Sequence, residues 1–198
     1  MANDTGGFGL RPARHYKGAS SWQVEKWYVH ADYGTAIFVG DPILYQPATA
    51  YQDPTGVHLS AAVSAGTTGT MINGVCVGIE PIQTDLNKTY MPASTGGYIY
   101  VMTGPDVVYE VRDNGAGTPT KTFVGQNCDL VATAAGSTIT GLSGFELNAA
   151  AVSTDQADAV HIIGIANKAD NTLADDVIWL VRLNTSENAA GLFDGVAT

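Results

Sequence analysis

The feature that most constrains this chain is a succession of short apolar runs, each followed closely by Gly, Pro, Asn or Asp. The clearest runs are YIYVM at 98–102, VHIIGI at 160–165 and VIWLVRL at 177–183. Runs of this length, rich in β-branched and aromatic residues and bounded by turn formers, are typical of strands. No long amphipathic pattern is found. We therefore predict an all-β fold, a β-sandwich or barrel-like body of about ten short strands with few or no long helices.

The other expected strands follow the same pattern along the chain. They cover 23–29, 35–39, 43–45, 57–63, 75–79, 107–112, 130–133 and 137–140. The last two flank Ala135-Gly136, and we expect them to form a hairpin. Helical turns are expected only at 125–130 or 155–159.

The composition agrees with one globular domain that makes broad contacts. The 198 residues are enough to bury a core, and a hydrophobic content of 45% argues against an unfolded protein. Charged residues make up only 14% of the chain, well below the usual quarter. So low a charge content favours a surface that is largely covered by partners.

The charge is unevenly distributed. The net charge of −10 argues against general nucleic-acid binding, because affinity for the phosphate backbone comes from Lys and Arg. Residues 1–30 carry four basic and two acidic side chains, 4 − 2 = +2, so the rest carries −12. We expect an extended N-terminal docking arm at 1–30, a β-rich body at 31–185 and a C-terminal tail at 186–198. A basic arm would dock on an acidic surface; the open alternative is that it folds back on its own acidic body.

The arm also holds the candidate binding residues. Residues 1–20 are rich in Gly and show neither a 3.6-residue nor a 2-residue period, and two tryptophans follow. Aromatic and Arg side chains are common anchors at protein interfaces. The predicted partner-binding residues are Phe8, Leu10, Arg11, Pro12, Arg14, Lys17, Trp22, Trp27 and Tyr28.

Residues that carry enzymatic chemistry show no spacing of a known site. The four histidines include no helix-borne metal pair and no His-Glu-x-x-His motif. Residues 141–144, GLSG, fall one residue short of a nucleophile elbow. The acidic stretch at 170–176 departs from the EF-hand order, so a solvated turn is favoured over a bound cation. We therefore predict no catalytic residue, no metal ligand and no cofactor.

Cysteines and termini bear on location. Cys76 and Cys128 have neither the number nor the spacing of a disulfide framework or a metal site, so buried thiols are expected. We expect no signal peptide in the first residues, and no apolar run reaches membrane length. These features favour production in a reducing cytosol.

Several segments, taken in order, resemble a family of tailed-bacteriophage virion proteins encoded next to the major capsid protein. The similar segments are 3–12 (NDTGGFGLRP), 35–42 (TAIFVGDP), 78–81 (GIEP), 90–95 (YMPAST), 123–130 (FVGQNCDL), 141–147 (GLSGFEL) and 179–184 (WLVRLN). None is a mechanistic motif, so the resemblance depends on the whole set, which spans nearly all of the chain. Cys128 stands where the family usually has Ala.

The resemblance implies a non-enzymatic capsid decoration or cement protein that stabilises the phage head. The implied partner is the phage major capsid protein, and the implied assembly is a homo-oligomer, with a trimer favoured over a dimer. The implied location is the outer surface of the virion capsid, after production in the host cytoplasm, without direct nucleic-acid or membrane contact. Two alternatives stay open: a tail, connector or host-binding virion protein, and a small carbohydrate-active enzyme or binding module, for which Asp106 and Glu110 are the carboxylates to test.

Overall fold

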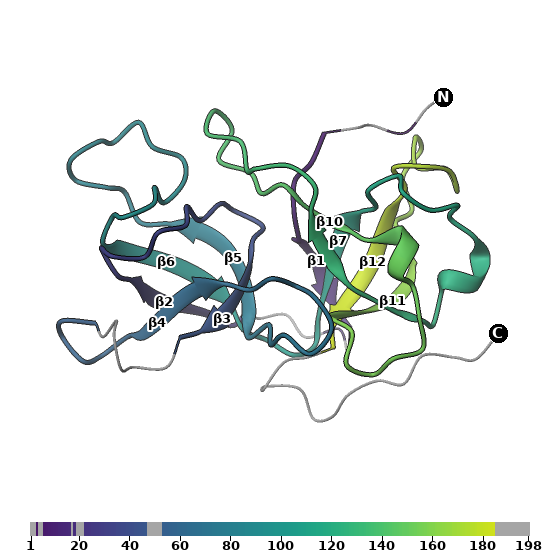
Figure 1. Ribbon diagram of the computed structural model, residues 1–198, viewed down its shortest axis with the longest axis horizontal. Helices are drawn as coiled ribbons and strands as arrows, with labels where there is room; N and C mark the ends of the chain where they lie inside the picture. Colours follow the sequence, from purple (N-terminus) through teal and green to yellow (C-terminus); the bar gives the residue numbers. More distant parts are fainter. Residues whose placement is uncertain (1–2, 4–5, 17, 19–21, 47–52, 185–198) are drawn as a thin grey trace.

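The computed structural model describes residues 3, 6–16, 18, 22–46 and 53–184. In this part the chain forms two β bodies that lie side by side, a barrel and a sheet (Figure 1). The described helical elements are two single 3-10 turns, at Lys121–Phe123 and Ala149–Ala151. The predicted all-β class is therefore confirmed, and the helical turns lie at neither of the two places where they were expected.

The barrel is a closed sheet with the strand order β2-β4-β3-β5-β6. Its strands are β2 (Val24–Val29), β3 (Pro42–Tyr45), β4 (Leu59–Val63), β5 (Gly74–Ile79) and β6 (Gly97–Met102). β2 pairs antiparallel with β6 along its whole length and parallel with β4, which closes the ring. Alternate side chains fill the interior, among them Trp27, Val29 and Ile99. Closure leaves the barrel no unpaired edge to protect.

The second body is a five-stranded sheet with the order β1-β7-β12-β11-β8. Its strands are β1 (Arg11–His15), β7 (Val107–Arg112), β12 (Ile178–Leu183), β11 (Val160–Ile165) and β8 (Asn127–Cys128). All neighbours pair antiparallel. A two-stranded ribbon of β9 (Leu130–Ala132) and β10 (Phe145–Leu147) contributes Leu130, Phe145 and Leu147 to the core of this body.

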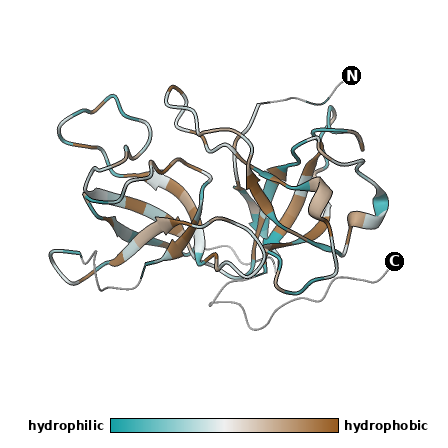
Figure 2. Cartoon of the chain, in the orientation of Figure 1, coloured by the Kyte–Doolittle hydropathy of each residue, from teal (hydrophilic) through white to brown (hydrophobic). Residues whose placement is uncertain are grey.

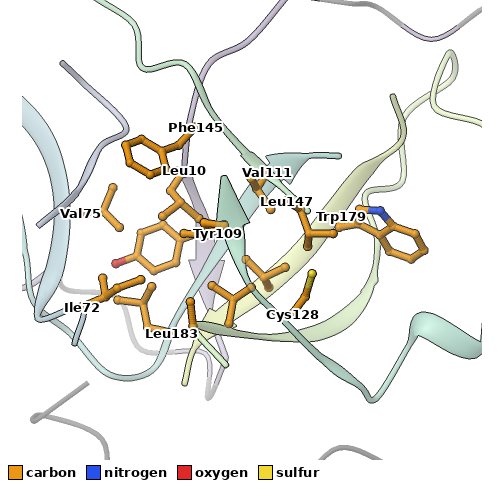
Figure 3. Close-up of a cluster of buried hydrophobic side chains, with 14 of the residues drawn as sticks. Leu10, Ile72, Val75, Tyr109, Val111, Cys128, Phe145, Leu147, Trp179 and Leu183 are labelled. Atoms are coloured by element: carbon orange, nitrogen blue, oxygen red, sulfur yellow. The ribbon is translucent and has the colours of Figure 1, made fainter. Parts of the chain in front are cut away.

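One hydrophobic cluster joins the two bodies. Tyr109 of β7 lies at its centre, with Leu10 from the N-terminal segment and Val75 from the barrel strand β5 around it (Figure 3). Met102 of β6 belongs to the same cluster. Apolar residues, coloured brown, lie along the strands of both bodies (Figure 2). The barrel and the sheet are thus packed against each other through shared apolar side chains.

Two expected strands do not form. Segment 35–39 makes only isolated bridges, from Ile37 to Met91 and from Val39 to Leu142. Residues 138–140 form a turn, and β9 pairs with β10 instead of with 137–140. The expected strand at 137–140 does not form because 133–144 consists mostly of small, uncharged residues, which offer little apolar surface for a sheet to bury. The short strands β1, β8 and β10 were not predicted.

The described part of residues 1–30 is not a free arm, which corrects the expectation of an extended arm. β1 pairs with β7, and β2 is part of the barrel. Leu10 is buried at 1% exposure, and the Asn3 amide donates to the carbonyl oxygens of Thr172 and Asp175. These residues instead fold back on their own body, which is the alternative given above for the basic stretch. The expected tail at 186–198 lies outside the described residues.

Segment 38–42 ties the N-terminal segment to both bodies. Gly40 accepts a hydrogen bond from the Leu10 N–H (2.9 Å) and donates its own N–H to the Cys76 carbonyl (2.8 Å). The Ser143 N–H donates to the Val39 carbonyl (2.9 Å). Gly40 has φ +98°, and a Cβ atom there would lie 2.5 Å from the Phe8 carbonyl oxygen, so the close approach requires glycine.

Asp41 is the buried carboxylate of this segment. Its Oδ2 accepts the Phe38 N–H at 2.8 Å, and the Ser143 hydroxyl also donates to the carboxylate. Burial raises the pKa of Asp41 to about 6, although both hydrogen bonds act to lower it. The folded protein therefore binds a proton at Asp41 more tightly than the unfolded chain does.

We predict that Asp41→Asn removes one component of the pH dependence of stability. Because the folded pKa is raised, the wild-type protein loses free energy of unfolding as the pH rises from about 4 to about 6, by up to about 3 kcal/mol. The amide introduced by the substitution keeps an oxygen for the Phe38 N–H but does not titrate. Urea unfolding at pH 4 and pH 7 should therefore show that the free energy of unfolding of Asp41→Asn, compared with that of wild type, is more favourable at pH 7 than at pH 4. A difference that is independent of pH, or equal to that of the exposed-site control Asp32→Asn, would contradict this prediction.

We also predict that Leu10→Ala destabilises the fold by about 3 kcal/mol, the usual cost of truncating a fully buried leucine. Trp22→Ala should cost less than about 1 kcal/mol, because Trp22 is 45% exposed. Urea unfolding of both variants measures the two values. A Leu10→Ala protein as stable as wild type would mean that the N-terminal segment does not pack on the core in solution.

Candidate partner-binding groove between the barrel and the sheet

An apolar groove of about 560 Å³ runs along the junction of the two bodies. Its walls come from the N-terminal segment, the start of β2, strands β5 and β6, and the loop before β10. The lining residues are Phe8, Leu10, Arg11, Pro12, Trp22, Val24, Val39, Cys76, Val77, Met102 and Leu142. We call this surface the junction groove.

The junction groove combines a buried floor with exposed apolar walls. Leu10, Cys76 and Met102 are at most 5% exposed and form the floor. Trp22 and Val24 are 45% and 42% exposed, although they are large apolar side chains. Exposed apolar residues are ordinary when scattered, but a contiguous group in a concave surface marks a binding site.

Five of the nine predicted partner-binding residues meet in this groove. They are Phe8, Leu10, Arg11, Pro12 and Trp22, although Leu10 is part of the floor and packs in the core. Arg14 is exposed on β1 and does not line the groove, and Lys17 lies outside the described residues.

Trp27 and Tyr28 lie outside this groove, and the burial of Trp27 corrects its assignment as a partner-binding residue. Trp27 is 2% exposed inside the barrel, where its ring meets the edge of Tyr45. Tyr28 packs beside Tyr98, with ring centroids 5.4 Å apart, on the outside of the β2–β6 pair. The alternation of β2 contained this signal, because a strand that exposes position 24 turns position 27 to the opposite face.

Sequence reasoning missed half of the groove. Val39, Val77 and Leu142 come from segments far apart in the chain, and each looks like an ordinary strand or loop residue in the sequence. Only the pairing of β5 with β6 and the bridge between Val39 and Leu142 bring them beside Trp22 and Val24. No local pattern could have found them.

The rim of the groove carries a charged cluster. Arg11 donates its Nε–H to Glu110 Oε2 at 3.0 Å, and Lys168 Nζ donates to the same oxygen at 2.7 Å. The Arg11 guanidinium also lies over the Phe8 ring, 4.5 Å from its centroid. Burial alone would raise the pKa of Glu110, but the hydrogen bonds from Lys168 and Arg11 outweigh it and lower the pKa. Two cations thus share one ionised carboxylate.

The edge of β1 is protected against addition of another strand. Pro12 has no N–H to donate, and the register with β7 shifts between Pro12 and Arg14. The His15 carbonyl accepts the Gly18 N–H at 3.4 Å. Proline, irregular register and charge are the usual devices that keep edge strands from pairing. The groove is therefore suited to receiving side chains rather than a hydrogen-bonded strand.

The carboxylates suggested for glycan chemistry are engaged in ion pairs. Asp106 lies 3.5 Å from an Arg182 nitrogen, and Glu110 pairs with Arg11 and Lys168. A lowered pKa does not suit Glu110 to act as a general acid near neutral pH. Burial raises the pKa of the Cys76 and Cys128 thiols, which does not suit a nucleophile.

A second groove of about 750 Å³, more polar than the junction groove, lies on the barrel beside Lys26, Glu80 and Tyr98. Lys26 Nζ sits 4.2 Å from the centroid of the Tyr98 ring and donates to Glu80 at 2.8 Å. The aromatic ring that could stack a sugar is therefore already in contact with a cation. This geometry favours the junction groove as the candidate site.

Two absences and the comparisons with known proteins bear on other functions. Within the described residues, no group of three or more His, Cys, Asp or Glu side chains could hold a metal ion. Among the same residues, no helix is long and apolar enough to cross a membrane. Comparisons of the chain with protein-family models, with curated proteins and with solved structures found no match in any of the three.

Proposed function

We propose that this chain is a structural, non-enzymatic protein of a tailed-bacteriophage head. It binds the outer surface of the assembled capsid and cements neighbouring major capsid subunits against the internal pressure of packaged DNA. The observation that carries the proposal is the junction groove, an apolar surface with exposed walls, which five of the predicted binding residues line. The resemblance of the sequence to virion proteins encoded beside capsid proteins supports the identity of the partner.

The groove supports a binding mechanism without chemistry. Tryptophan is one of the residues most enriched among those that contribute most of the binding energy at protein interfaces, where it is buried in a desolvated contact. Trp22 provides such a side chain, and Val24 and Leu142 extend the apolar surface around it. Because each subunit would bind the assembled shell better than free capsid subunits, it would stabilise the shell by mass action.

The two-body fold suits a protein that holds neighbouring capsid subunits together under tension. The barrel and the sheet share one hydrophobic cluster, so a force applied at the groove is resisted by packed side chains on both sides. A homo-oligomer, with a trimer favoured, and a location on the capsid exterior belong to the same proposal. A tail, connector or host-binding role would use the same groove, and copy number separates it from a cement role.

We predict that changes in the exposed groove walls weaken binding to shells at least about tenfold. Val24→Asp places a charge in the groove, and Trp22→Ala removes the aromatic anchor, while both positions are exposed enough to leave the fold intact. Co-sedimentation with purified shells that lack this protein measures binding, and thermal melting checks folding. Val57→Asp, at a 76% exposed apolar residue outside the groove, is the matched control. Wild-type binding by Val24→Asp would rule out the groove as the docking surface.

We further predict a copy number in purified virions comparable to that of the major capsid protein. Quantitative peptide mass spectrometry measures this number directly. A few copies per particle would instead assign the chain to the tail or connector. Absence from the virion would remove the proposal and reopen the enzyme hypothesis.

A further inference from the structure

We infer that the junction groove receives an extended segment of a partner protein, which places apolar side chains on the floor and a carboxylate against Arg11. The inference rests on the proposed function for the identity of the partner. The chemistry of the segment is argued from the groove itself.

The apolar half of the site follows from shape and exposure. The volume of about 560 Å³ lies within the usual range of ligand sites and has room for a few side chains. The floor residues Cys76 and Met102 are buried, whereas Trp22 and Val24 stand exposed at the side. A segment with alternating apolar residues would cover these walls and remove them from water.

The charged half of the site follows from the excess of positive charge at the rim of the groove. Arg11 and Lys168 both pair with the single carboxylate of Glu110, so this cluster carries one net positive charge. The Arg11 side chain is 52% exposed, and its contacts with Glu110 use Nε and Nη2. A guanidinium has five N–H donors and can bind a second carboxylate with the remaining ones. Arg14 adds a further exposed cation on the same strand.

A protein segment fits better than a second copy of the chain. Pro12 and the irregular register of β1 disfavour two copies continuing one sheet, because proline and bulges are devices that limit pairing at an edge strand. The positive rim of an otherwise acidic protein instead complements an acidic residue of the partner segment.

The test uses three short peptides and the full chain. The first is acetyl-Val-Ser-Leu-Ser-Phe-Asp-amide. In its extended form the Val, Leu and Phe side chains share one face, and the last residue carries a side-chain carboxylate. The other two replace the final Asp by Asn or by Lys. None of the peptides contains tryptophan, and of the three tryptophans of the chain Trp22 is the exposed one in the groove, while Trp27 and Trp179 are buried. A change in the protein's tryptophan fluorescence therefore reports binding to wild type, Arg11→Gln, Val24→Asp and the control Val57→Asp.

We predict that wild type and Val57→Asp bind the Asp peptide about five-fold more tightly than the Asn peptide, the effect of one partly exposed ion pair. The Lys peptide should bind more weakly than both. Arg11→Gln should bind all three peptides equally, and Val24→Asp should bind none. Loss of the preference in Arg11→Gln with retained binding of the Asn peptide shows that the variant is folded and that the groove is intact.

Three outcomes would overturn the inference. They are no saturable binding of any peptide, equal binding of the Asp and Asn peptides by wild type, and self-association of wild type that Val24→Asp abolishes. The last would mean that a second copy occupies the groove. Peptide selectivity without shell binding would retain this inference and reject the proposed function. Shell binding that depends on Val24, without a preference for the Asp peptide, would retain the proposed function and reject this inference.

Discussion

The packing of Tyr109 against Leu10 and Val75 is the contact on which the rest of the structure depends. These side chains come from the sheet, the N-terminal segment and the barrel, and each is at most 1% exposed. Because a fully buried side chain of this size stabilises a fold by several kcal/mol, the two bodies are held together by the same energy that forms their cores. Leu10 and Met102 belong both to this hydrophobic cluster and to the floor of the groove, so the groove lies directly against the packed junction.

Buried polar groups add specificity to the same core. Arg112 forms an ion pair with Glu146, with both side chains less than 10% exposed, and Trp179 donates its indole N–H to Asp113 at 3.2 Å. Buried ion pairs contribute little net stability, but breaking one is costly because the remaining charge stays desolvated. The pair links β7 to β10 and thereby holds the ribbon over the sheet. Gly7 lies beside both charges, so the N-terminal segment also covers this pair.

The groove joins these structural features to the proposed function. Its walls are residues that the fold leaves partly uncovered, and its rim carries two cations on one carboxylate. An apolar surface gives affinity, and a charge at its border gives orientation and selects among partners. A protein that binds in this way requires neither a catalytic group nor a cofactor, which fits a chain whose Asp106, Glu110 and cysteines are engaged in ion pairs or buried.

The sequence by itself determined the all-β class and most of the strand positions, and it singled out Phe8, Arg11, Pro12 and Trp22, which the structure places along one groove. These properties depend on local alternation, turn residues and side-chain type, which can be read in a short window. Only the tertiary structure decided that residues 11–15 form a sheet strand, that Trp27 faces the barrel interior, and that Val39, Val77 and Leu142 complete the groove. Pairing between distant strands sets these positions, because which face of a strand is buried depends on its neighbours rather than on its own residues.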